Sequence, residues 1–147
     1  MTTRSKPGNS PATAPQSLSQ VGAQVSTRHL TGLGELDRVL GGGIVPGSLT
    51  LVAGDPGVGK STLLLGIAAD IAGSVGQTLY VTGEESMAQV KMRADRIGVS
   101  GEGLFLLQAT ALDEVMDHLE RIRPALTVVD SIQTLCDDSV AGTAGSV

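Results

Sequence analysis

Short apolar runs alternate with amphipathic segments along the chain from Arg28 onward. Continuously apolar runs of this length are typical of strands that are buried on both faces of a parallel sheet. We expect such strands at Ser48–Ala53, Thr78–Thr82, Leu104–Leu107 and Leu126–Asp130. The pattern therefore predicts an α/β fold in which strands and helices follow one another.

The segments between the runs carry the periodicity and the end signals of helices. One of them opens on a capping box, in which Gln89 follows Ser86 by three residues. Glycines follow the first predicted helix, and Thr110 is expected to cap the last one before Pro124 ends it. We expect the helices over residues 33–40, 60–72 and 86–97, and from the cap at Thr110 to just before Pro124. Helices that connect parallel strands cover both faces of the sheet.

A glycine-rich loop lies between the first predicted strand and the helix that begins at Lys60. The stretch GDPGVGKS fits the pattern G-x-x-x-x-G-K-[ST], and its strand–loop–helix setting supports it as a phosphate-binding loop. Its amides and the helix N-terminus favour an anion, Lys60 suits the β and γ phosphates, and Ser61 suits Mg²⁺. We expect nucleotide to be bound by Gly54, Asp55, Pro56, Gly57, Val58, Gly59, Lys60, Ser61 and Thr62. A glycine-rich turn that binds nothing is the alternative.

Acidic side chains follow two of the predicted strands. Asp130 ends the strand Leu126–Asp130 at the edge where open α/β sheets bind ligands, so we expect it to help hold Mg²⁺. A carboxylate that merely starts a turn is the alternative. Glu84 and Glu85 follow the strand Thr78–Thr82, and either one could polarise the water that attacks the γ phosphate. The alternative is that both only favour the start of the next helix.

The polar residues after Asp130 include Gln133, which could sense the γ phosphate or belong to an ordinary loop. The basic residues Arg93 and Arg96 are interpreted as part of a solvated helix face rather than as a DNA contact.

Composition narrows the class of protein further. The chain has 147 residues and a formal net charge of −5, which favours one domain and argues against a broad basic nucleic-acid surface. Residues 1–27 carry three prolines among small polar residues, so we expect a flexible tail there and the folded domain at 28–147. The single cysteine excludes an internal disulfide and a four-cysteine zinc site within the chain. No apolar run is long enough for a membrane span and no secretory signal is visible, so a cytoplasmic location without membrane attachment is expected.

Four stretches resemble the RadA (Sms) family of bacterial DNA-repair ATPases, within the RecA superfamily. They are TGLGELDRVLGGGIVPGSL (Thr31–Leu49), GDPGVGKSTLLL (Gly54–Leu65), LYVTGEES (Leu79–Ser86) and VVDSIQT (Val128–Thr134). The resemblance implies a RecA-like P-loop NTPase core that binds ATP and Mg²⁺ and hydrolyses ATP.

The resemblance also implies roles for individual residues and for partners. Lys60 and Ser61 would hold phosphate and Mg²⁺, Asp130 would hold the metal, Glu84 would activate water, and Gln133 would act as a polar sensor. The family members form a homo-oligomeric ring on single-stranded DNA, work with a RecA-type recombinase and drive branch migration during recombinational repair.

The chain departs from the family at both ends. The family carries a four-cysteine zinc finger at its N-terminus, whereas residues 1–27 contain no cysteine, so no zinc site is expected. The family continues with further core strands and a Lon-like domain, so we expect a truncated core that covers only the N-terminal part of the ATPase domain. A later strand would separate Ser48–Ala53 from Leu126–Asp130. Without it we expect exposed strand edges, poor solubility and little ATPase activity.

Two other functions fit the phosphate loop. One is a P-loop kinase for a small molecule, which would need a lid and an acceptor pocket that the sequence does not display. The other is a KaiC-like regulatory module that uses nucleotide only for assembly.

Overall fold

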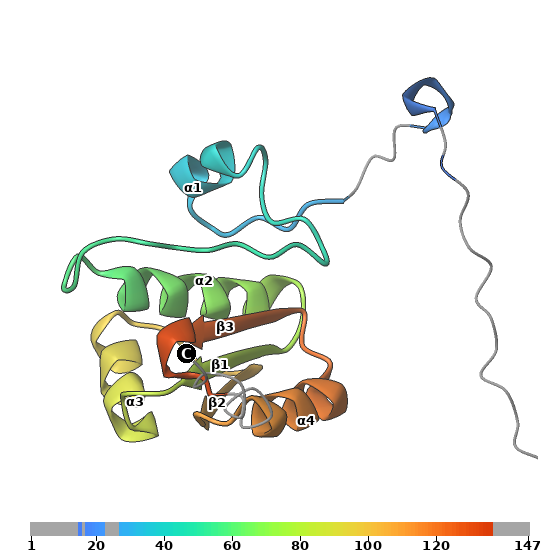
Figure 1. Cartoon of the computed structure of the whole chain (residues 1–147). Helices are drawn as coiled ribbons and strands as arrows, with labels where there is room; N and C mark the ends of the chain where they lie inside the picture. Colours follow the sequence, from blue (N-terminus) through green and yellow to red (C-terminus); the bar gives the residue numbers. More distant parts are fainter. Residues whose placement is uncertain (1–14, 16, 23–26, 137–147) are drawn as a thin grey trace, which may run out of the picture.

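Three parallel strands form the sheet of this protein, whose computed structural model describes residues 15, 17–22 and 27–136 (Figure 1). They are β1 (Thr78–Thr82), β2 (Leu104–Gln108) and β3 (Leu126–Asp130), in the order β2-β1-β3. The parallel register pairs Thr82 with Gln108 on one side and with Asp130 on the other. The carboxyl ends of all three strands therefore lie level, and the three predicted strands are confirmed, β2 being one residue longer.

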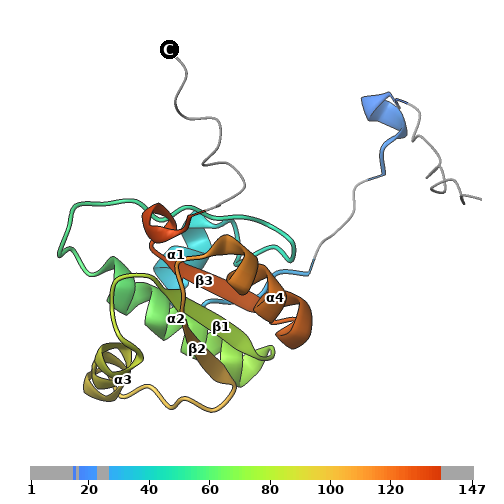
Figure 2. The same cartoon turned by 60° about the horizontal axis from the view of Figure 1, so that its bottom comes forward.

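Helices cover both faces of this sheet, as the sequence predicted. On one face, α2 (Lys60–Ser74) and α3 (Met87–Arg96) pack over a core centred on Leu65, Tyr80 and Val128. On the other, α4 (Leu112–Ile122) packs Val115 against β1. Figures 1 and 2 show α2 and α4 on opposite sides of the strands. Each strand alternates its side chains between the two cores, which explains why hydrophobic residues stand at successive positions along it and not only at every second one.

A small unit precedes α2 along the chain. Its helix α1 (Gly34–Val39) lies within the predicted span, and an antiparallel bridge joins His29 to Ile44. Asp37 is buried and accepts hydrogen bonds from the backbone N–H and the hydroxyl of Thr31, at 2.9 and 2.8 Å. Those two bonds satisfy a carboxylate oxygen that burial would otherwise penalise.

The predicted strand Ser48–Ala53 is wrong as regards both pairing and burial. The segment makes no ladder with β1–β3, and Leu49 and Leu51 are 99% and 79% exposed. In Figure 1 it runs apart from the sheet, beyond α2. An apolar run becomes a strand only when a neighbour satisfies its backbone groups, and none of the described residues pairs with this run.

The predicted cap at Thr110 is also wrong, because α4 begins at Leu112 with Ala111 as its N-cap. The backbone of Cys136 accounts for the shift. Its N–H donates to the Thr110 carbonyl at 2.7 Å, and its carbonyl accepts from the Leu112 N–H at 3.0 Å. These bonds hold residues 110–112 extended, so the helix starts later than the side-chain signal suggested.

The predicted flexible tail at 1–27 lies mostly outside the described residues. Within that range the structure describes a short 3₁₀ helix, Leu18–Gln20, whose Leu18 is exposed. The domain boundaries at 27 and 28 stay a prediction. Within the part of the chain that the structure describes, no helix has both the length and the apolar character to cross a membrane.

We predict that replacing Leu49 and Leu51 together by Lys reduces self-association of the chain. Both side chains are exposed on an unpaired apolar segment, and such segments recruit other chains. Light scattering at increasing protein concentration measures the effect. The control is Met87→Lys combined with Met92→Lys, which places the same charge at two exposed apolar positions on α3 and should leave association unchanged. Equal association of all three proteins would contradict the prediction.

Candidate nucleotide-binding site

The glycine-rich loop ends where α2 begins, so its backbone and the first turn of the helix face the same space. Gly57 and Gly59 have φ values of 80° and 102°, a region that glycine enters without strain. A Cβ at either position would meet no atom within 4 Å, so the space beside the loop is open. The first turn of α2 contains no acidic residue, and the positive end of its dipole is therefore available to an anion.

Lys60 is anchored to the same loop. Its Nζ donates to the carbonyl oxygens of Gly54 at 2.6 Å and Asp55 at 2.9 Å. An ammonium group has three protons, so one N–H remains for a ligand. The lysine is therefore held over the loop, where a phosphate on the loop amides would meet it.

Side chains from three segments meet next to this loop. Ser61 from the first turn of α2, Asp130 from the end of β3, and Glu84 and Glu85 from the turn after β1 line one pocket of about 90 Å³. Thr82 and Ser131 complete the lining. Residues separated by seventy positions in the sequence are thus brought together, because β1 and β3 end level and α2 packs across both.

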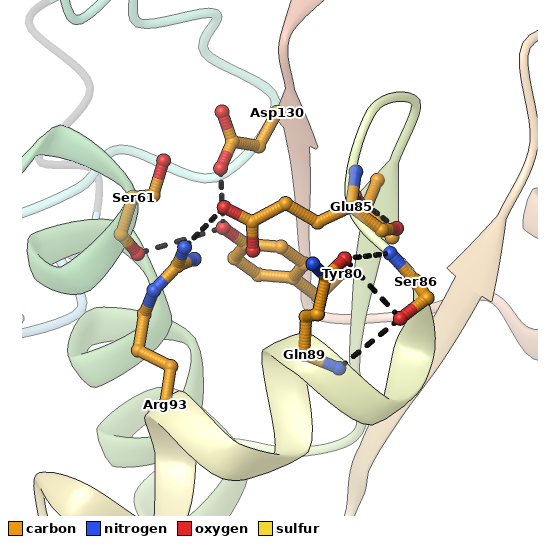
Figure 3. Close-up of polar contacts among 8 residues, drawn as sticks. Ser61, Tyr80, Glu85, Ser86, Gln89, Arg93 and Asp130 are labelled. Atoms are coloured by element: carbon orange, nitrogen blue, oxygen red, sulfur yellow. Dashed lines mark hydrogen bonds and ion pairs between the residues drawn. The ribbon is translucent and has the colours of Figure 1, made fainter. Parts of the chain in front are cut away.

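Tyr80 connects the hydrophobic core to this pocket (Figure 3). Its side chain is fully buried, and its hydroxyl donates to Oδ2 of Asp130 at 2.7 Å. The same hydroxyl oxygen lies 3.5 Å from the Ser61 carbonyl oxygen. Burial raises the pKa of Tyr80 far above its ordinary value, and the hydrogen bond and charge of Asp130 raise it further. The hydroxyl is therefore a protonated donor at any physiological pH.

Sequence reasoning missed this contact of Tyr80. A signal was present, since Tyr80 stands two residues before Thr82 on β1, and Thr82 is the register partner of Asp130. Side chains at even spacing share a face of the sheet. That argument needs the pairing of β1 with β3, which the sequence alone did not supply.

The two glutamates after β1 have different surroundings. Glu85 forms an ion pair with Arg93 of α3, and the side chains are 34% and 15% exposed. Its backbone N–H donates to the Thr82 hydroxyl at 3.1 Å, and that hydroxyl donates to its carbonyl at 2.9 Å. Glu84 is exposed and makes no side-chain hydrogen bond to the described residues, although it lines the same pocket. Arg93 was expected on a solvated helix face, and the structure instead places it in a mostly buried ion pair. Arg96 is exposed.

The turn after β3 packs against the turn after β1. The Gly83 N–H donates to the Asp130 carbonyl at 3.1 Å, and a Cβ at Gly83 would overlap the Thr134 side chain. Only glycine leaves room for this approach. Gln133 lies in the same turn but is exposed and does not line the pocket, so the structure does not bring it to the other site residues; Ser131 lies there instead.

The donor set of the pocket fits Mg²⁺. Magnesium takes oxygen ligands and keeps several waters, so one carboxylate and one hydroxyl beside a phosphate are enough protein ligands. Asp130 and Ser61 provide these oxygens, and Oδ1 of Asp130 makes no hydrogen bond to the described residues. No group of three or more His, Cys, Asp and Glu within residues 15, 17–22 and 27–136 is arranged to hold a metal without such help.

Comparison with known proteins places this arrangement in a family. A family model described as an AAA domain matches residues 15–143, which include the loop, Glu84 and Asp130. The chain belongs to this AAA domain family. The match covers every described element, so the sheet and its helices belong to an AAA domain.

Curated relatives of this AAA domain carry the name DNA repair protein RadA. The chain is 50% identical over 139 residues to RadA of Mycobacterium tuberculosis H37Rv and 44% identical over 133 residues to RadA of Bacillus subtilis 168. It is 50% identical over 121 residues to RadA of Campylobacter jejuni. These matches cover 93%, 90% and 82% of the chain but only 29%, 29% and 27% of the relatives. The resemblance to RadA is confirmed, and the chain spans less than a third of the length of these relatives.

We predict that Glu85→Gln destabilises the AAA domain and that Glu84→Gln does not. Neutralising Glu85 leaves the charge of the mostly buried Arg93 without its partner, which should lower the free energy of unfolding by about 1–2 kcal/mol. Urea unfolding followed by circular dichroism measures both variants. Glu84→Gln is the matched control, since the same change is made one residue away on an exposed side chain. Equal midpoints for the two variants would show that the ion pair contributes nothing.

Proposed function

We propose that this chain is the ATP-binding and ATP-hydrolysing part of a RadA-like DNA-repair motor. The observation that carries the proposal is the convergence of Ser61, the last residue of a complete phosphate loop, with Asp130 and Glu84 on one pocket at the level ends of β1 and β3. The match to an AAA domain and to proteins named RadA supports it.

The phosphate loop and the start of α2 bind the nucleotide in this proposal. The loop amides and the positive end of α2 hold phosphate oxygens, while the remaining N–H of Lys60 reaches the β and γ phosphates. Ser61 and Asp130 hold Mg²⁺, which neutralises charge that develops on the phosphates during transfer. These residues bind and orient the nucleotide without taking part in proton transfer.

Glu84 is the residue that we assign to water activation. A general base needs a carboxylate within reach of the water and not already committed to a strong partner. Glu85 is committed to Arg93, whereas Glu84 lines the pocket without an ion-pair partner among the described residues. The resemblance to RadA selects the same residue, independently of the geometry.

Turnover by the chain alone should be slow. The segment Ser48–Ala53 is not paired with the described sheet, so the position of the loop relative to Asp130 depends on the packing of α2 and not on a strand beside β3. A misplacement of about 1 Å can lower a catalysed rate roughly a hundredfold. Groups that a neighbouring subunit inserts into a related site add on the order of a thousandfold or more.

On the strength of the RadA relatives, we propose that the partners are single-stranded DNA and a RecA-type recombinase. We also propose that the protein assembles into a homo-oligomeric ring and acts in the cytoplasm. Phosphate release with and without single-stranded DNA tests the first of these. Stimulation by DNA supports the repair motor, whereas turnover that depends on a small phosphate acceptor would favour a kinase. Assembly with nucleotide but without any effect of DNA would favour a KaiC-like module.

We predict that Lys60→Ala weakens binding of ATP with Mg²⁺ at least tenfold. The variant loses a charge-assisted contact to phosphate, which typically contributes about 1.5–3 kcal/mol. Calorimetric titration of the whole chain measures the affinity. Lys91→Ala is the control, because Lys91 is exposed on α3 and, among the residues that the structure describes, pairs with Asp95 alone. If Lys60→Ala binds as tightly as Lys91→Ala, the assignment of the phosphate loop is refuted.

We predict that Glu84→Gln abolishes hydrolysis and spares ATP binding. The carboxylate is needed when water is activated, not when phosphate is held. A single-turnover assay with protein in excess over labelled ATP separates phosphate release from binding and tolerates slow turnover. Normal hydrolysis by Glu84→Gln together with its loss in Glu85→Gln would assign the role to the other glutamate.

A further inference from the structure

Three side chains of β1 point toward α2 and α3, and all three carry a hydroxyl. Thr78 donates to the Ala68 carbonyl of α2 at 2.9 Å, and Thr82 bonds the backbone of Glu85. Both of these hydroxyls bond backbone atoms, so their role is to stabilise the fold. Tyr80, between them, is different because its hydroxyl donates to a side chain, the Asp130 carboxylate.

The tyrosine ring carries its hydroxyl from the hydrophobic core to the rim of the pocket. The ring packs among buried residues such as Leu65 and Val128 on the α2 face of the sheet. A phenylalanine would fill the same core volume, so the packing does not require a hydroxyl at this position. The hydroxyl has one proton to donate. It donates that proton to Oδ2 of Asp130 at 2.7 Å, because the Ser61 carbonyl oxygen is farther away, at 3.5 Å.

This hydrogen bond divides the two oxygens of Asp130 between two tasks. Oδ2 is held from the core side, and Oδ1 makes no hydrogen bond to the described residues while Asp130 lines the pocket with Ser61. A carboxylate held by one oxygen cannot rotate freely, and second-shell donors of this kind orient metal ligands and typically change metal affinity 10–100-fold.

We propose that Tyr80 is a positioning residue that holds Asp130 by Oδ2 and so presents Oδ1 to Mg²⁺. The proposal rests on the proposed function, since it concerns the metal that accompanies the nucleotide. Tyr80 acts through Asp130 and touches neither nucleotide nor metal.

The first experiment compares ATP affinity with Mg²⁺ and with EDTA by calorimetry. In the wild type Mg²⁺ should tighten ATP binding, and in Tyr80→Phe this gain should shrink about tenfold while the affinity in EDTA stays unchanged. Thr78→Val is the matched control, because it removes a buried hydroxyl from the same face of β1 without touching Asp130, and it should keep the full gain.

The outcomes separate this proposal from the function on which it rests. A full magnesium gain in Tyr80→Phe, or an equal loss of affinity with and without Mg²⁺, overturns the positioning role and leaves nucleotide binding intact. If the wild type binds ATP equally well with Mg²⁺ and with EDTA, the positioning role is likewise overturned and nucleotide binding is left intact. A wild type that binds no ATP overturns the proposed function, and the positioning role with it. In the Asp130→Asn background, Tyr80→Phe should have no additional effect on the gain, and a further tenfold loss would contradict the proposal.

A second measurement needs no nucleotide. The chain has one tyrosine and no tryptophan, so its ultraviolet emission reports on Tyr80 alone. Asp130→Asn replaces a charged acceptor by a neutral amide and should change that emission, whereas Glu84→Gln should not, because its side chain is exposed and does not bond Tyr80. Unchanged emission in Asp130→Asn would show that the phenol and the carboxylate are not bonded in solution, which overturns the proposal.

Discussion

The pairing of β1 with β3 in parallel register is the constraint on which the site depends. It makes Thr82 and Asp130 level, so that the turn carrying Glu84 and Glu85 leaves the sheet beside the Asp130 carboxylate. Because α2 packs across both strands, its first turn brings Lys60 and Ser61 to the same end of the sheet. A slip of β3 by one residue would turn Asp130 to the α4 face and empty the pocket of its metal ligand.

Local sequence signals were enough to predict those strands and helices whose formation depends on residues close together in the sequence. The strands Thr78–Thr82 and Leu126–Asp130 and the helix capped by Ser86 lie where the pattern predicted them, since apolar runs and capping boxes act over a few residues. Ser48–Ala53 carries an equally good strand pattern and is unpaired, because pairing depends on a neighbour and not on the run itself. The start of α4 was likewise set from a distance, by the backbone of Cys136.

The same distinction applies to the candidate site. The phosphate loop could be predicted from the sequence because its chemistry is contiguous, and Asp130 followed from its place at a strand end. The difference between Glu84 and Glu85 could not, since it comes from Arg93 one helix away. Nor could the role of Tyr80, which reads as an ordinary core aromatic until the two strands are paired. The roles assigned to the phosphate loop with Lys60 and Ser61, and to Glu84, Asp130 and Gln133, stay predictions.

The anchoring of Lys60 bears on the entropy of nucleotide binding. A free lysine side chain has about 1.5–2 kcal/mol of rotamer entropy to lose when it is immobilised on a phosphate. Here two of its protons are already bonded to the Gly54 and Asp55 carbonyls, so much of that freedom is lost when the protein folds. The cost then falls on the stability of the domain instead of on the affinity for nucleotide, and the charge is in place before any ligand arrives.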